Sequence, residues 1–94
     1  MIGKGLKEIP IKFNKIKNNF NCGDNELTNL EFSPIKIGGN FDCSSNLLLS
    51  LEIFPQHIHG KFNLYDNKLN TLLYVPKKVD RLINLEKNPF LGKH

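Results

Sequence analysis

The side chains best suited to chemistry in this sequence are two cysteine thiols and a pair of histidine imidazoles. Cys22 and Cys43 could form a disulfide or bind a metal ion. His57 and His59 would lie on one face of a β-strand, where two imidazoles can share a metal ion. Neither a glycine-rich phosphate loop nor a nucleophile–base motif accompanies them. What these four side chains can do depends on the elements that position them.

Those elements follow from a repeat of 21 residues, the spacing between Phe20, Phe41 and Phe62. We call each 21-residue repeat a row, and a further row begins at Ile83. Such a fixed period, with one asparagine in each row, indicates a solenoid in which short units stack on one another. The 94 residues leave room for one domain. We expect it to comprise an N-terminal half-repeat cap (1–19), three full repeats (20–40, 41–61 and 62–82) and a partial repeat that forms the C-terminal cap (83–94).

Each row has the same predicted layout. It opens on Phe-x-Cys or Phe-x-Leu, in which two inward residues flank an outward one, as in a short strand. Three residues later comes an inward asparagine. Its buried side-chain amide needs hydrogen-bond partners, which the backbone N–H and C=O groups of a turn can supply. The asparagines of successive rows form a structural ladder: Asn25, Asn46, Asn67 and Asn88. Further inward positions are apolar, namely Leu27, Leu48, Leu69 and Phe90, then Leu30, Leu51 and Leu72, then Ile37, Ile58 and Val79.

The returning side of each row is predicted to be extended or irregular, with little or no helix. Proline recurs there and blocks helix continuation, at Pro34, Pro55 and Pro76. Gly39 and Gly60 are expected to turn the chain into the next strand. In the N-terminal cap, Leu6, Ile9 and Ile16 match the apolar register of the full rows. The C-terminal cap is short, so we expect weak self-association through the ends of the stack.

The register also assigns the four chemical side chains. Cys22 and Cys43 occupy a column that is filled by leucine in the next rows, which indicates buried hydrophobes. Strands roughly 4.8 Å apart do not exclude a disulfide by distance, but parallel inward side chains disfavour one. His57 and His59 fall in a predicted turn, in columns that hold Lys36 and other variable residues. We therefore predict no catalytic residue, no metal ligand and no cofactor.

The outward strand positions form the candidate binding surface. They fall into three columns: Asn19, Asn40, Lys61 and Leu82; then Asn21, Asp42, Asn63 and Asn84; then Gly23, Ser44, Tyr65 and Glu86. Asp66 lies at their edge, beside the asparagine ladder. Tyrosine next to an exposed leucine is typical of interaction hot spots. The aromatic residues of the returning side give an alternative patch if they are exposed: Phe32, Phe54 and Tyr74.

The charge pattern gives a second hypothesis. The net charge is +4, yet both ends of the chain are basic and the middle is acidic. Basic ends could contact nucleic acid through Lys12, Lys15, Lys17, Lys77, Lys78 and Arg81, although a nucleic-acid-binding protein usually has a continuous basic face. No apolar run approaches the length that spans a bilayer, and the N-terminus lacks the apolar core of a signal peptide. We expect a cytoplasmic protein with reduced cysteines and no membrane partner.

The pattern F-x-C-x-x-N-x-L-x-x-L-E-x-x-P-x-x-I-x-G resembles the short leucine-rich repeats of small proteins from tailed bacteriophages and large DNA viruses, and those of bacterial effectors. The resemblance covers about residues 6–90. One departure is that Ile37, Ile58 and Val79 precede the strand by four positions instead of three. The resemblance implies a leucine-rich-repeat solenoid with a short parallel β-sheet on its concave face. It also implies binding of another protein and no enzyme activity. A phage-encoded inhibitor of a host defence protein or CRISPR nuclease complex, acting in the host cytoplasm, is one specific form of this expectation.

Overall fold

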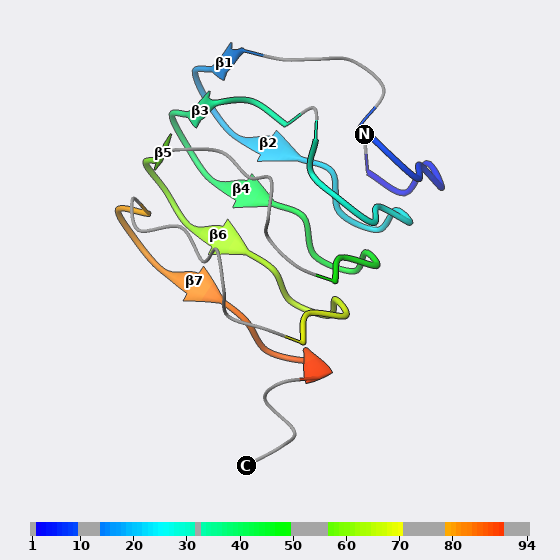
Figure 1. The fold of residues 1–94 in the computed structure, drawn as a ribbon. Helices are drawn as coiled ribbons and strands as arrows, with labels where there is room; N and C mark the ends of the chain where they lie inside the picture. The colour runs from blue at the N-terminus through cyan, green and yellow to red at the C-terminus, as the bar shows by residue number, and fades with distance from the viewer. Residues whose placement is uncertain (1, 10–13, 32, 50–56, 71–78, 90–94) are drawn as a thin grey trace.

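The computed structural model describes residues 2–9, 14–31, 33–49, 57–70 and 79–89, and these ranges contain short parallel strands and no α-helix (Figure 1). Two sheets are present. One has the order β1-β3-β5 and the other β2-β4-β6-β7. The first consists of β1 (Lys15–Ile16), β3 (Lys36–Ile37) and β5 (His57–Ile58). The second consists of β2 (Phe20–Asn21), β4 (Phe41–Asp42), β6 (Phe62–Asn63) and β7 (Ile83–Asn84).

The sequence period is the pairing register of both sheets. In the four-stranded sheet, Phe20 pairs with Phe41, Phe41 with Phe62, and Phe62 with Ile83. In the three-stranded sheet the same spacing joins Lys15, Lys36 and His57 in succession, and it joins Ile16, Ile37 and Ile58. An isolated bridge extends this second line from Ile58 to Val79. Successive rows therefore lie side by side along each sheet (Figure 1).

The three-stranded sheet corrects the expectation of a single strand at the start of each row. Its strands have two residues, so each offers one inward side chain, such as Ile37. Alternation needs several positions to be visible in a sequence, and one apolar residue between polar neighbours does not provide them. His57, which the sequence places in a turn, belongs to β5.

One hydrophobic cluster joins the inward residues of both sheets. Its members that are at most 7% exposed are Ile9, Phe20, Cys22, Leu27, Leu30, Ile37, Phe41, Cys43, Leu48, Ile58, Phe62, Leu64 and Leu69. The rings of Phe41 and Phe62 stack with centroids 5.1 Å apart, and Phe20 tilts against Phe41 at 5.7 Å. Offset and tilted ring pairs of this kind add about 0.5–1.5 kcal/mol beyond area burial.

The inward asparagines connect each row to the one before it. In the second full row, the Asn46 amide donates to the carbonyls of Cys43 and Ser44 in its own row and to that of Cys22 in the previous row, each at 3.1 Å. Its Oδ1 accepts a bond from the backbone N–H of Leu27, also in the previous row, at 2.9 Å. Equivalent backbone N–H groups donate to the Oδ1 atoms of Asn25, Asn67 and Asn88, namely those of Leu6, Leu48 and Leu69.

The residue before each asparagine has left-handed backbone, with φ between 53° and 57°, at Asp24, Ser45, Asp66 and Lys87. This conformation costs non-glycine residues roughly 1–2 kcal/mol each. The same turn recurs in every described row, which indicates that the asparagine hydrogen bonds offset its cost.

Gly39 and Gly60 have a different role from the turn-forming one that the sequence suggests. Their φ angles lie outside the left-handed region. A Cβ on Gly60 would instead lie 2.7 Å from the carbonyl group of Gly39, closer than real Cβ atoms approach. Glycine is required at this position because the backbones of adjacent rows nearly touch.

The N-terminal segment also lies against the first full row. The N–H of Glu26 donates to the carbonyl of Leu6 at 2.7 Å, and Ile9 is buried. Leu6 and Ile16 pack against the core. Several residues that the sequence singles out lie outside the described ranges: Lys12, Phe32, Leu51, Phe54, Pro55, Leu72, Tyr74, Pro76, Lys77, Lys78 and Phe90. Among the described residues, no helix could cross a membrane.

Asn46→Ala should lower the free energy of unfolding by about 2–4 kcal/mol, because it leaves the buried backbone groups around the turn without partners. Urea denaturation followed by circular dichroism measures the change. Asn70→Ala is the matched control, because Asn70 is exposed, and it should change the stability little. A loss of stability for Asn46→Ala as small as that for Asn70→Ala would show that the inward asparagine is dispensable.

Candidate functional site

The outward residues of β2, β4, β6 and β7, with the residues flanking them, form one surface that we call the strand face. Register pairing places Asn21, Asp42, Asn63 and Asn84 side by side across it. Backbone hydrogen bonds between rows bring the flanking columns into the same order, as in the bonds from Phe41 N to Lys61 O and from Ser45 N to Tyr65 O, both at 2.8 Å. The structure thus brings the predicted columns together.

The middle column of the strand face also has a local structural role. In each row its side-chain Oδ1 accepts a hydrogen bond from the backbone N–H two residues later, at 2.9–3.0 Å, in Asn21, Asp42, Asn63 and Asn84. Asp42 additionally accepts the hydroxyl proton of Ser44 at 2.6 Å. Asparagine and aspartate favour such turns because their short side chains reach this N–H. Asp42 and Asn63 therefore hold the end of the strand as well as facing outward.

Two asparagines of the first column form a second connection between rows. Asn19 Oδ1 accepts the backbone N–H of Asn40, and Asn40 Oδ1 accepts that of Lys61, both at 2.8 Å. Their sequence positions alone place these side chains on the binding surface and do not reveal this role. Their recurrence at the repeat spacing is the signal that could have revealed it.

The C-terminal half of the strand face presents apolar, aromatic and charged groups. Leu82 is 63% exposed, the highest exposure among the large hydrophobic residues described. Tyr65 is half-buried, and Lys87 Nζ lies 5.9 Å from its ring centroid, within cation–π range. Lys61 and Glu86 are exposed beside them. We call these five residues the Tyr65 patch.

The edge of this patch includes Asp66. Its side-chain carboxylate accepts a hydrogen bond from the hydroxyl of Ser45, in the preceding row, at 3.2 Å. Asp66 itself is exposed. The N-terminal half of the face, by contrast, has the small residues Gly23 and Ser44 and no large side chain in that column. The chemistry of the face therefore changes along the stack.

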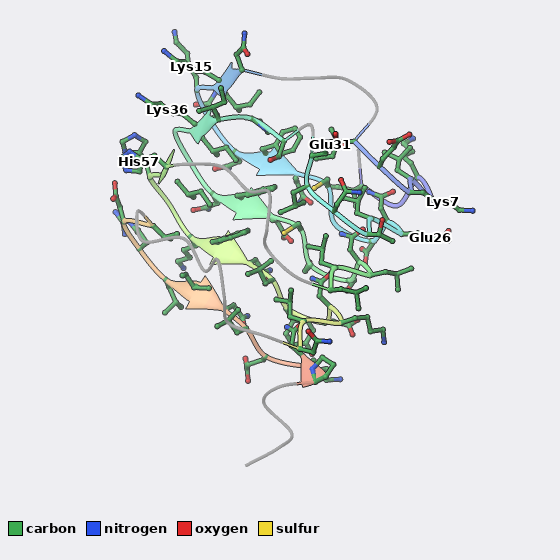
Figure 2. The ribbon with its side chains drawn as sticks, in the orientation of Figure 1. Lys7, Lys15, Glu26, Glu31, Lys36 and His57 are labelled. Carbon is green, nitrogen blue, oxygen red and sulfur yellow. The ribbon has the colours of Figure 1, made fainter. Side chains whose placement is uncertain are left out.

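A separate basic edge lies along the three-stranded sheet. Lys15 and Lys36 are paired in register on β1 and β3, and both are exposed. Figure 2 shows them in one line with His57 at the edge of the molecule. Lys17 follows β1 and is exposed too. Repulsion between like charges on neighbouring strands is destabilising, so an anion at this edge would relieve it.

The two histidines meet a carboxylate from the next row. His57 Nε2 lies 3.1 Å from Asp80 Oδ1, and His59 Nδ1 lies 3.2 Å from Asp80 Oδ2. The hydrogen bond with His57, together with the charges of both imidazoles, holds the pKa of the Asp80 carboxyl below its usual value. No carboxylate lies at ligand spacing from the two histidines within their own row. Stacking supplies one from the following row, which a search within a row cannot find.

Cys22 and Cys43 lie in the core with free thiols and no exposed surface. Burial is the main cause that raises the pKa of the Cys22 thiol to about 12, with the Asp42 charge adding to it. Burial likewise raises the pKa of Cys43 well above its usual value. Thiols that stay protonated and out of contact with solvent are poor nucleophiles and poor metal ligands. They act as small apolar residues of the core.

Comparison with protein-family models, curated proteins and solved structures found no match for this chain.

Proposed function

We propose that the chain is a short leucine-rich-repeat solenoid that binds another protein through the Tyr65 patch on its strand face. The observation that carries the proposal is the 63% exposure of Leu82 on the same face as Tyr65. Exposing a leucine costs stability that burying it would gain, about 1.5–3 kcal/mol for a full side chain. Tyrosine is among the residues enriched in interaction hot spots.

The solenoid assignment is supported by the agreement between sequence period and sheet register. Each row contributes one inward asparagine whose amide and carbonyl join two rows. In such a solenoid the strand face is the concave one, and concave faces gather side chains from several rows onto one partner. Weak end-to-end association of such stacks is part of the same proposal.

The resemblance to phage and viral repeat proteins narrows the proposal. It supports a partner among host defence proteins, such as a CRISPR nuclease complex, with inhibition as the outcome and the host cytoplasm as the location. The mixed charges of the Tyr65 patch, which holds Lys61, Lys87 and Glu86, suit a protein surface that also carries both signs.

A second candidate function is binding of nucleic acid, for which the basic edge is the specific observation. Lys15 and Lys36 stand in register on neighbouring strands, and Lys17 follows Lys15 by two residues. Such a line of charges could follow a phosphate backbone. Arg81 is exposed too, but it follows Asp80, the carboxylate that contacts the two histidines.

The protein-binding proposal is tested with the double substitution Tyr65→Ala and Leu82→Ala. After capture of the partner from host lysate and its identification by mass spectrometry, titration calorimetry with the purified partner should show affinity lowered at least about tenfold, because each side chain is an anchor. Leu49→Ala is the control, since Leu49 is 56% exposed and lies off the strand face. Unchanged affinity of the double variant, with unfolding unchanged, would contradict binding through the patch.

The nucleic-acid alternative is tested by fluorescence anisotropy with a labelled oligonucleotide at increasing salt. If the basic edge binds, log affinity should fall linearly with log salt, and Lys15→Ala with Lys36→Ala should make the slope shallower by about two phosphate contacts. Absence of binding at the lowest salt concentration would rule out this second function.

A further inference from the structure

We propose that His57, His59 and Asp80 form a binding site for one divalent transition-metal ion of the zinc class. One ligand atom from each residue lies within 4.8 Å of the other two. The histidine nitrogens that face Asp80 stand 3.1 Å and 3.2 Å from its two oxygens. Tetrahedral zinc with bonds of about 2.0–2.1 Å separates its ligand atoms by about 3.4 Å. The two histidine–carboxylate separations are therefore close to those of a tetrahedral site.

The backbone holds the three ligands in place before any ion binds. His57 is part of β5, and the N–H of His59 donates to the carbonyl of Ile37 at 3.0 Å. The N–H of Asp80 donates to the carbonyl of Ile58 at 3.0 Å, next to the bridge between Ile58 and Val79. Asp80 is therefore stacked on the histidine row by main-chain bonds. A preformed site loses less entropy on binding than one assembled from mobile loops.

The ligand chemistry selects the class of ion. Two imidazoles and one carboxylate suit Zn²⁺, Cu²⁺, Ni²⁺ or Co²⁺, whereas Mg²⁺ and Ca²⁺ prefer oxygen ligands alone. His57 is half-buried, and His59 and Asp80 are exposed, so the ion is accessible from solvent. Figure 2 shows His57 projecting from the edge of the molecule at β5. Three protein ligands leave a fourth position for water or for a donor atom of a binding partner.

The site belongs to one pair of rows among those described. In the preceding row, Lys36 and Gly38 occupy the positions of His57 and His59, and neither is a suitable ligand there. The ion would join the row of the two histidines to the row of Asp80. Because the unfolded chain does not bring these residues together, the ion binds the folded state preferentially and stabilises it.

Isothermal titration calorimetry with ZnCl₂ tests the proposal on the intact chain in a buffer that does not chelate metals. One ion per chain should bind saturably, and the ion should raise the melting temperature. His57→Ala, His59→Ala and Asp80→Asn should each weaken binding at least about tenfold. Removing a residue that only hydrogen-bonds to a metal ligand typically weakens metal binding by about that factor, and removing the ligand itself should cost at least as much. Co²⁺ should give the visible absorption bands of a four- or five-coordinate site, lost in all three variants.

His94→Ala is the matched control, because it removes the remaining histidine of the sequence, and it should bind Zn²⁺ as the wild type does. Lys36→Ala should tighten binding, because Lys36 is paired in register with His57 and repels the ion. Absence of saturable binding by the wild type would overturn the proposal. So would unchanged binding by Asp80→Asn, or loss of binding in His94→Ala. Circular dichroism of each variant establishes that it is folded.

Discussion

The structure depends on the inward asparagine that each row places directly after its left-handed residue. One amide donates to carbonyls of two rows while its oxygen accepts an N–H from the earlier row, as Asn46 does between Cys43, Cys22 and Leu27. A turn buried beside the core would otherwise hold unsatisfied backbone groups, at a cost of about 1–3 kcal/mol each. The asparagine therefore fixes the spacing of the rows, and the strand pairings and the phenylalanine stack follow from that spacing.

A fixed register has consequences for the surface. Because residues paired in register are one repeat apart, outward side chains form columns, and one column can hold side chains bonded to the backbone at one end and exposed side chains at the other. The column of Asp42 closes local turns, and Asn19 and Asn40 join rows, so polar residues on the strand face are largely used by the fold. Among the described residues, the side chains of Tyr65 and Leu82 make no such hydrogen bond to the backbone, which is why we propose them as binding residues. The pairing of His57 with Asp80 arises from the same stacking.

The sequence predicts the features that recur within a row. Phe41, Cys43 and Leu48 are buried where the period places them, and the parallel strands follow the register. It does not predict features that depend on contacts between two rows, or strands that are too short to give an alternating pattern. The sheet of β1, β3 and β5 leaves one inward residue per strand, the partner of His59 lies one row away, and Gly60 reveals its role only through the approach of a neighbouring backbone. The outward asparagines look like ordinary surface residues until the rows are stacked.

Hydrogen exchange of single backbone amides, followed by NMR, tests the central role of the asparagine ladder most directly. The amides of Leu27, Leu48 and Leu69 donate to side-chain oxygens of Asn46, Asn67 and Asn88. If these bonds hold the rows together, the three amides should exchange as slowly as the amides of Phe41 in β4 and of Cys43 just after it, through global unfolding. Exchange at the rate of an unstructured chain, while the strand amides remain protected, would contradict the account.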